Sequence, residues 1–585
     1  MVPALSLANS NTTARQRLVV ALLVVAIVSS FILFWRLGDK PLENWDEGIH
    51  ANVTLEMYRQ GAWLDLSYRD ELYTAKPPLS FWMRAALFTV FGETELAIRL
   101  WSAVAGVATT LLLSYWAWQV FGNARMAVLT GVLFVTGRYV LFHAFRTGET
   151  DGLFMLFFVA AMYAYWRSVA LPPPLTPPPS ARHSAEPRLR RGVQAGGGPL
   201  SPHPPSPQRG EWIRWWFIWF GLLTGLAVMT KSFAGAIPAI IVATDMILGR
   251  RWRSVGWRTI GWSALAAVVV TLPWHLLELV RHGREFWQSY FGFHILERAG
   301  EALYANQVPW YWYAEIIGRR MFPVVAFVPL AVLLGARRWL RSRDELDRLL
   351  LVWAAAVFSL FSVIQTKFDW YVLPIYPALV LLLARAVWEL VKRPDWLLTG
   401  GFLVSLAAAV YGLPLGLAHE GLLWQLTPYS YLPAAALSSG GRVVVGLTTA
   451  AVVWLVVALL RRWRERPLKA VTTLSTIYVV ALALGWQISY LRHLPTSSPL
   501  QELAGRLDHL KAGQVDVVGV KLLTQPAGYF YLRRAGVAVR EVTAETAAGP
   551  YVLTTTASRD QFGQGRAILE RDRFVLLELI SAAKD

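Results

Sequence analysis

Apolar runs recur along the whole chain, separated by shorter polar connectors. A transmembrane helix needs about 20 consecutive apolar residues, so the pattern predicts a polytopic α-helical membrane protein with about 13 transmembrane helices. The first run has no A-x-A-like cleavage site behind it, and we expect it to remain as a helix. The predicted spans cover residues 18–36, 95–119, 125–144, 150–168, 213–230, 234–249, 258–279, 320–336, 348–365, 370–391, 397–417, 441–460 and 469–489.

Basic residues orient these spans. If residues 1–17 are cytoplasmic, every dense Lys/Arg cluster falls on the cytoplasmic side, as the positive-inside rule requires. These clusters are Arg250–Arg253, Arg337–Arg343, Lys392–Arg393 and Arg461–Lys469. The long loops 37–94 and 280–318 and the carboxyl-terminal tail then lie outside. We therefore predict a multi-pass inner (plasma) membrane protein with a cytoplasmic amino terminus and a periplasmic or extracellular carboxyl-terminal domain.

Two segments depart from the transmembrane domain of residues 18–490. Residues 171–212 are rich in Pro, Gly and Ser without a hydrophobic period, which predicts a disordered cytoplasmic loop or, alternatively, a ligand for a Pro-recognising domain. Residues 491–585 begin with the helix-like "PLQELAGRLDHL" and continue with short β-rich runs such as "QVDVVGV" and "FVLLELI". This tail predicts a small α/β domain with an accessory role.

Composition supports the membrane assignment and excludes several kinds of functional site. The 585 residues are 55% hydrophobic and 16% charged, with a mean hydropathy of +0.40. The net charge of +18 resides mostly in the connectors, so it reflects topology and not a nucleic-acid partner. The chain has no Cys, which excludes disulfides, thiolate metal sites and cysteine nucleophiles.

Three motifs in the predicted outer parts carry candidate chemistry. Asp46 and Glu47, in "NWDEGIH", could bind a cation, orient a hydroxyl or accept its proton, or they are a solvated acidic pair. Lys76, in "YTAKPPLSFW", precedes two prolines that stiffen the loop, and it suits either a lipid phosphate or the role of an interfacial anchor. Asp151, in "FRTGETDGLFMLFF", is either functional or a helix cap.

Further cations lie on the same predicted face, where the positive-inside rule does not place them. His294 and Arg298 share helical spacing in the second outer loop. The others are Lys231, Arg319, Arg320 and Lys367. Their convergence predicts a binding site for a lipid-linked phosphate, although the neighbouring aromatic residues are also typical of an interfacial belt.

The order of these motifs resembles a known family. "WDEGIHANVTLEMYRQGAW", "YTAKPPLSFW", "RTGETDGLFMLFF", "GLLTGLAVMTKSFAG", "FGFHILER" and "TKFDWYVLPIYPAL" follow one another as in glycosyltransferase family 39, the polyprenyl-phosphate-sugar-dependent C-type glycosyltransferases. This family includes aminoarabinose transferases of lipid A and protein O-mannosyltransferases. The resemblance covers about residues 36–392, and the tail is similar to the small periplasmic domain of bacterial members.

The resemblance implies roles for individual residues. Asp46 matches the family's first-loop catalytic aspartate and Glu47 its acidic neighbour, while Asp151 matches the second aspartate. Lys76 matches the lysine of a K-P-P element and is expected at the donor phosphate.

The same resemblance places two residues of the second outer loop. His294 and Arg298 match an H-x-L-E-R element that is also expected to face the donor phosphate. Many bacterial relatives have Glu or His before the K-P-P lysine, whereas this chain has Ala75. A divalent metal is thus the one cofactor to consider, with Asp46, His50 and Asp151 as its remaining possible ligands.

The sequence therefore predicts an inverting glycosyltransferase at the outer face of the membrane. Its partners would be a polyprenyl-phosphate sugar donor, membrane lipids and an acceptor that is a lipid A-like glycolipid, a protein or a wall polymer, with no nucleic acid. The alternative is a glycolipid transporter or flippase without catalysis. Transporters typically show internal repeats and midplane polar residues, whereas here the notable charges gather in outer loops or at outer helix ends.

Overall fold

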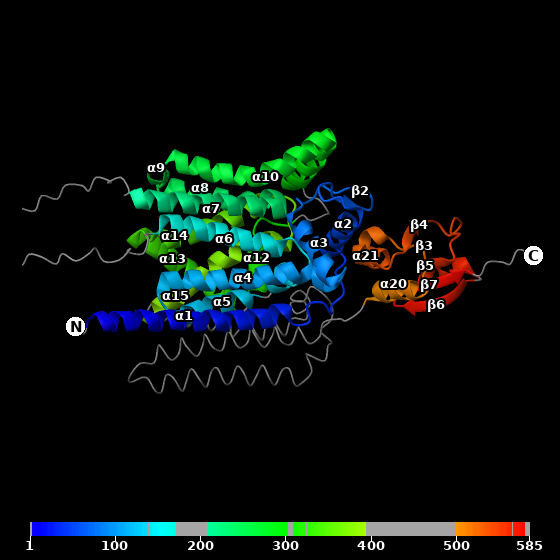
Figure 1. Ribbon diagram of the computed structural model, residues 1–585, viewed down its shortest axis with the longest axis horizontal. Helices are drawn as coiled ribbons and strands as arrows, with labels where there is room; N and C mark the ends of the chain where they lie inside the picture. The colour runs from blue at the N-terminus through cyan, green and yellow to red at the C-terminus, as the bar shows by residue number, and fades with distance from the viewer. Residues whose placement is uncertain are drawn as a thin grey trace, which may run out of the picture.

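The computed structural model describes residues 3–137, 140–170, 207–301, 308–321, 324–392, 498–563 and 565–579. Up to residue 392 these ranges form a bundle of long helices, and the carboxyl-terminal ranges form a small sheet domain at one end of it (Figure 1). The main bundle helices are α1 (Pro3–Phe34), α4 (Glu95–Phe121), α6 (Asp151–Val169), α7 (Pro207–Lys231), α8 (Ile237–Leu248), α10 (Trp257–Phe286), α14 (Glu345–Val363) and α15 (Tyr376–Lys392).

Seven stretches in this described part are long and apolar enough to cross a membrane. They are Ala14–Phe34, Glu95–Phe121, Asp151–Val169, Gly210–Leu248, Trp257–Gly300, Glu345–Val363 and Asp369–Leu390. Each overlaps one or two of the predicted spans, which confirms a polytopic α-helical membrane protein. The predicted spans 397–417, 441–460 and 469–489 lie outside the described residues.

Two predicted spans have different bounds in the structure. The run 125–144 divides into α5 (Ala124–Val135) and the π-helical η1 (Val140–Phe145). The run 320–336 is shifted, because η5 (Val324–Phe327) precedes α13 (Val328–Ser342), which has a proline in its first turn. A proline fits the first turn of a helix, where its missing N–H is not needed. The proline therefore marks the start of α13, which the hydropathy pattern alone placed too early.

The proposed disordered segment 171–212 lies mostly outside the described residues, but its predicted end is wrong. Helix α7 begins at Pro207. Trp212 donates from Nε1 to the carbonyl of Arg167 at 3.0 Å, and the Arg167 guanidinium lies over the Trp212 ring. These contacts with α6 hold the first turns of α7 in a helix despite the polar composition there.

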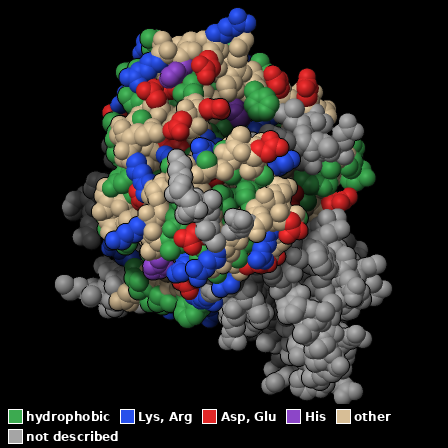
Figure 2. Space-filling view, turned by 90° about the vertical axis from the view of Figure 1, so that its right-hand side faces the viewer, with side chains coloured by type: hydrophobic (Ala, Val, Ile, Leu, Met, Phe, Trp, Pro, Cys, Tyr) green, Lys and Arg blue, Asp and Glu red, His purple; other side chains and the backbone are tan. Residues whose placement is uncertain are grey.

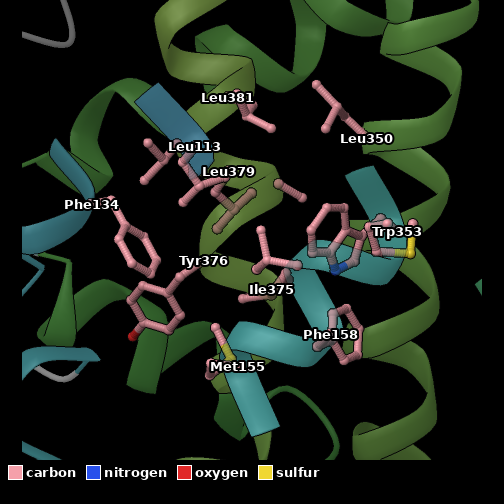
Figure 3. Close-up of a cluster of buried hydrophobic side chains, with 14 of the residues drawn as sticks. Leu113, Phe134, Met155, Phe158, Leu350, Trp353, Ile375, Tyr376, Leu379 and Leu381 are labelled. Carbon is pink, nitrogen blue, oxygen red and sulfur yellow. The ribbon is translucent and has the colours of Figure 1, made fainter. Parts of the chain in front are cut away.

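A central core joins five helices. Leu113 of α4, Phe134 of α5, Phe158 of α6, Trp353 of α14 and Leu379 of α15 all point into one buried cluster (Figure 3). Lipid tails are as apolar as these side chains, so the hydrophobic effect contributes little to their association inside a bilayer. Close van der Waals packing holds the helices together instead.

Small residues permit the closest helix contacts. A Cβ added to Gly221 of α7 would lie 1.9 Å from the backbone oxygen of Ser263 of α10. We expect Gly221→Ala to push the two helices apart and to lower the stability of the protein by about 1–3 kcal/mol. A lowered Tm in detergent would show this. Gly261→Ala, on α10 with no atom within 4 Å of the added Cβ, is the matched control, and an equal Tm loss there would contradict the packing argument.

The predicted outer loop 37–94 folds into small elements between α1 and α4. They are α2 (Asp46–Gln60), the paired strands β1 (Ser67–Tyr68) and β2 (Glu71–Leu72), and α3 (Leu79–Phe91). Figure 1 shows them at the end of the bundle that carries the sheet domain. The short helix α9 (Trp252–Val255), within a predicted basic connector, lies at the opposite end.

Much of the predicted outer loop 280–318 is helical. Helix α10 continues to Phe286, with a non-helical break at Gly283 (φ 52°), and the π-helical η3 (Trp287–Glu297) follows. Next come α11 (Arg298–Gly300) and α12 (Trp312–Arg320). The predicted connection 280–318 is therefore built largely of short helices, and α10 extends beyond the predicted end of its span at residue 279.

The carboxyl-terminal domain is the α/β unit that the sequence predicted. Strands β3 (Gln514–Val517), β4 (Ala538–Glu541), β5 (Tyr551–Thr555), β6 (Gly565–Arg571) and β7 (Phe574–Leu579) form one sheet in the order β4-β3-β5-β7-β6. The pairs of β3 with β4 and β5 are parallel, and β7 pairs antiparallel with β5 and β6. Helices α20 (Pro499–His509) and α21 (Pro526–Arg534) complete the domain.

This domain docks directly on α2. Asn52 of α2 donates from Nδ2 to the carbonyl of Pro526 at 2.8 Å, and the N–H of Ala527 donates to Asn44 Oδ1 at 3.1 Å. A Cβ on Gly48 would lie 2.6 Å from the backbone nitrogen of Ala527, so the contact needs a glycine. The start of α21 therefore rests on the first turn of α2.

Candidate active site

The predicted catalytic Asp46 is the first residue of α2. A carboxylate at a helix amino terminus is stabilised by the unpaired N–H groups and the helix dipole. The side chain is half-buried, so it is reachable from outside. Asp46 thus lies at the sheet-domain end of the bundle, where Lys and Arg side chains are interspersed with Asp and Glu over the surface (Figure 2).

Glu47 is a fully buried anchor for this turn. Arg99 of α4 binds it with two hydrogen bonds, Nε to Oε1 at 2.7 Å and Nη2 to Oε2 at 2.8 Å. The N–H groups of Gly148 and Glu43 also donate to the two oxygens, at 2.6 and 2.7 Å. Burial by itself would raise the pKa of Glu47, because it disfavours the charged carboxylate. The charge of Arg99 and these hydrogen bonds have the larger effect, and the pKa of Glu47 is lowered. With both oxygens occupied, Glu47 positions the site and does not handle a substrate proton.

Arg99 also fixes the chain before α2. Its guanidinium donates to the carbonyls of Leu37, Lys40 and Pro41 at 2.6–3.1 Å. Arg146 makes the same kind of contact with the end of α1, through the carbonyls of Ile32 and Leu33. Two buried arginines thus satisfy the free carbonyls between α1 and α2 and set the position of Asp46.

Asp46, His50 and Glu149 form a compact group. One ligand atom from each lies within 4.8 Å of the others. His50 and Glu149 are buried, and His50 Nδ1 lies 3.5 Å from Glu149 Oε2. Burial, followed by the charges of Asp46 and Asp151, raises the pKa of Glu149 well above its ordinary value, while burial and nearby Arg84 lower that of His50.

Two of the three possible metal ligands predicted from the sequence belong to this group, and the third does not. Glu149, and not Asp151, completes the group with Asp46 and His50. Asp151 instead begins α6, is buried, and pairs with Lys231 at the end of α7. His143 Nε2 lies 3.9 Å from the other Asp151 oxygen. Asp151 and Lys231, predicted separately, thus form a contact pair.

Lys76 lies within the field of these same groups. Burial and the charges of Arg298 and Lys231 lower its pKa, whereas Asp46 and Asp151 act in the opposite direction. Four predicted residues from different parts of the chain are therefore electrostatic neighbours of Lys76. The sequence prediction that these motifs converge is consistent with this arrangement.

The segment that follows α10 supplies Arg298 and His294. Lys76 and Arg298 are the charged neighbours of His294 in η3. The N–H groups of Gln365 and Thr366 donate to the carbonyls of Ala299 and Arg298, at 3.1 and 3.2 Å. These backbone bonds tie the segment before α15 to α11 and hold Arg298 beside the site.

The remaining predicted cations have other surroundings. Arg320 donates from Nη2 to Asp369 at 2.7 Å, so its charge is already engaged. Lys367 is buried, and burial lowers its pKa. The side chain of Arg319 lies outside the described residues, although its backbone belongs to α12. Neither Arg320 nor Lys367 is among the electrostatic neighbours found for Lys76.

Comparison with known proteins finds relatives in sequence and in fold. The sequence profile of the family described as dolichyl-phosphate-mannose-protein mannosyltransferase matches residues 75–171, the range that carries Lys76, Glu149 and Asp151. An undecaprenyl phosphate-alpha-4-amino-4-deoxy-L-arabinose arabinosyl transferase from Enterobacter sp. (strain 638) is 27% identical over 394 residues. That match covers 67% of this chain but only 64% of the relative, which is less than two thirds of its length.

Two further likenesses extend over more of the chain. The protein of the same name from Edwardsiella ictaluri (strain 93-146) is 25% identical over 501 residues, covering 84% of this chain and 81% of the relative. The crystal structure of ArnT from Cupriavidus metallidurans bound to undecaprenyl phosphate has the same fold, with a TM-score of 0.70 and 18% identity over 96% of this chain and 98% of that one. The chain is thus similar in sequence to these transferases and shares the fold of ArnT. Its likeness to ArnT includes the arrangement of the helical bundle with the small sheet domain.

Sequence reasoning missed several residues of the candidate site. Arg146 and Glu149 stand beside Asp151 in the same motif but were given no role, and Arg99 was passed over. A signal for the arginines was present, because a charge in or beside an apolar run is costly unless a partner is buried with it. That argument predicts a buried partner for Arg99, and the structure identifies the partner as Glu47.

Proposed function

We propose that this chain is an inverting glycosyltransferase that moves a sugar from a polyprenyl-phosphate donor to an acceptor. The observation that carries this proposal is the placement of Asp46 and Asp151 in one electrostatic neighbourhood with Lys76, Arg298 and Lys231. A carboxylate beside several cations suits a reaction in which a hydroxyl loses a proton while an anionic phosphate leaves.

The cationic side chains and the Asp46 carboxylate have separate roles in the proposed step. The acceptor oxygen attacks the anomeric carbon of the sugar, the bond from that carbon to the phosphate oxygen breaks, and polyprenyl phosphate leaves. Lys76 and Arg298 stabilise the negative charge of the leaving phosphate, while Asp46 takes the proton of the acceptor hydroxyl. Glu47 holds Asp46 in place through Arg99.

The names of the relatives support the choice of donor class. The Enterobacter and Edwardsiella relatives are named as transferases that use an undecaprenyl-phosphate-linked sugar. We propose the same class of donor for this chain, with a lipid A-like glycolipid as acceptor. We also propose that the amino terminus is cytoplasmic and that the Asp46 end of the bundle faces the periplasm, since the basic connector around α9 lies at the other end.

The group of Asp46, His50 and Glu149 also fits a divalent cation. His50 Nδ1 is buried and has no hydrogen-bond partner among the described residues, and its lowered pKa leaves the imidazole neutral, as a metal ligand must be. A bound cation would supply positive charge near the acceptor and the leaving phosphate. Ala75 offers no ligand, so this set would be limited to the three residues named.

A direct assay tests the proposed function. Purified protein in detergent or nanodiscs should release free undecaprenyl phosphate from a labelled undecaprenyl-phosphate sugar when an acceptor glycolipid is present. The labelled sugar should appear on the acceptor in equal amount. Movement of intact donor across a vesicle membrane, with no cleavage, would instead establish the transporter function and remove this proposal.

The lowered pKa of Lys76 predicts how donor binding depends on pH. The free ammonium loses its proton at a lower pH than an ordinary lysine, whereas an anionic phosphate favours the charged form. When the pH is above the pKa of Lys76 in the donor-free protein, donor binding must take up a proton. The affinity for the donor should therefore fall as the pH rises above that pKa. Titration of undecaprenyl phosphate between about pH 7 and pH 10 would measure the fall.

An arginine variant provides the control for this prediction. The Arg side chain stays protonated over that range, so Lys76→Arg should bind the lipid phosphate with a much flatter pH dependence. Lys521→Arg, on the exposed surface of the sheet domain, should keep the wild-type dependence. A Lys76→Arg variant that follows the wild-type curve would exclude Lys76 as the titrating group.

A further inference from the structure

A second group of potential ligands lies away from the Asp46 site. Asp65, from the segment between α2 and β1, meets Glu278 and His282 near the end of α10. One ligand atom from each residue lies within 4.8 Å of the others. In the described part of the chain, this is one of two groups with three such residues this close together.

Local structure brings these three residues together. Glu278 and His282 are four residues apart on α10 and share one face of the helix. Trp274, one turn earlier, donates from Nε1 to the carbonyl of Leu64 at 3.2 Å and so fixes the residue before Asp65. The helical geometry breaks at Gly283, directly after His282.

Glu278 provides the observation that points to a ligand. Its side chain is only 2% exposed, and its Oε1 has no hydrogen-bond partner among the described residues. The other oxygen, Oε2, lies 3.7 Å from His282 Nε2, which is too long for a hydrogen bond. Buried carboxylate oxygens are normally paired with donors or cations, so this oxygen points to a bound partner beyond the described part of the chain.

The other two residues complete the arrangement. His282 Nε2 lies 3.2 Å from Asp65 Oδ1, so the imidazole nitrogen points between the two carboxylates. The second Asp65 oxygen accepts a hydrogen bond from Arg281 at 2.8 Å, which fixes the orientation of that carboxylate. The Asp65 and His282 side chains are 43% and 25% exposed, so an ion can enter from the aqueous side.

We propose that Asp65, Glu278 and His282 bind a divalent transition-metal cation, of the Zn²⁺ or Mn²⁺ class, separate from the Asp46 site. Two carboxylates and one imidazole are a common ligand set for such ions, and they leave coordination positions for water. The ion would join the first outer segment to the end of α10. It would thereby fix the start of η3, the segment that carries His294.

Metal binding by the full-length protein tests this site. The protein in detergent is treated with a chelator and dialysed, and Zn²⁺ is then titrated by calorimetry and by thermal unfolding. The wild type should bind one equivalent of Zn²⁺ at this site. Glu278→Gln and His282→Ala should each lower the affinity for that ion at least tenfold. Zn²⁺ should raise the Tm of the wild type and have little effect on the Tm of these variants.

Two histidine variants identify the site. His50→Ala removes a ligand from the other group, and His509→Ala changes a histidine at the end of α20 in the sheet domain. Both of these variants should still bind the Zn²⁺ ion that His282→Ala no longer binds. Glu278→Gln keeps the shape of the side chain and should be at least as stable as the wild type without metal, because it removes a buried unpaired charge.

Three outcomes would overturn the proposal. In the first, Glu278→Gln and His282→Ala bind Zn²⁺ as the wild type does. In the second, only His50→Ala loses the bound ion. In the third, the wild type binds no Zn²⁺ and Zn²⁺ leaves its Tm unchanged, in which case Glu278 is an uncharged buried acid and not a metal ligand.

Discussion

Replacing Asp46 with Asn should reduce sugar transfer by about 10²–10⁴-fold, the usual contribution of a general base. The amide has nearly the shape of the carboxylate but cannot accept the proton of the acceptor hydroxyl. Because Lys76 and Arg298 are untouched, the KM for the donor should change little while kcat falls. Release of undecaprenyl phosphate by purified protein measures both quantities.

A neighbouring aspartate provides the control for Asp46→Asn. Asp39 pairs with Arg36 on the surface of the same segment, and its side chain is 52% exposed. Asp39→Asn should leave both kcat and KM unchanged, and both variants should keep the wild-type Tm. Transfer by Asp46→Asn at a rate close to that of the wild type would mean that another group accepts the proton.

Removal of the Arg99 guanidinium is the change expected to destabilise the protein most. Arg99 and Glu47 are 1% and 0% exposed, and Arg99→Met leaves the Glu47 carboxylate buried without its counter-charge. Such a loss typically costs about 3–5 kcal/mol. The variant also loses the bonds to the carbonyls of the segment before α2, so transfer activity should fall together with the Tm.

A double variant separates charge from packing. In Glu47→Met with Arg99→Met both charges are gone, and a buried ion pair replaced by apolar residues of similar size often costs little. The double variant should therefore be more stable than Arg99→Met alone. Arg559→Met, which removes an exposed partner of Glu570, should change stability by less than about 1 kcal/mol. If Arg99→Met were as stable as Arg559→Met, the buried pair would not be the anchor of the turn.

The sequence predicts the membrane fold and the main candidates of the site for a physical reason. Hydropathy marks the spans, and residues at the same-side ends of spans must meet near one membrane surface. Asp151 follows from this logic, because it lies at the start of a predicted span. Asp46 and Lys76 lie within the loop 37–94, and their roles were predicted from the family resemblance. The α/β character of the tail follows from short apolar runs such as those of β5 and β7, which are separated by turn or helix signals.

Contacts that depend on side-chain direction could not be predicted. Glu149 and Asp151 are two residues apart before and at the start of α6, and only the folded turn shows that Glu149 faces His50 while Asp151 faces Lys231. Hydropathy also gave no reason to join residues as distant as Asp65 and His282. Contact between Asp65 and His282 depends on the length of α10. The sequence pattern predicted a shorter helix than the structure has.

The docking of α21 on α2 gives the sheet domain a mechanical link to the turn that carries Asp46. Asp46 lies two residues before Gly48, the position that admits the backbone of Ala527. The hydroxyl of Tyr531, also in α21, accepts a hydrogen bond from the N–H of Leu42 just upstream, at 2.7 Å. An antibody fragment or peptide that tilts α21 would thus displace the Asp46 carboxylate from the aqueous side. Inhibition of the proposed sugar transfer then requires no molecule that enters the lipid.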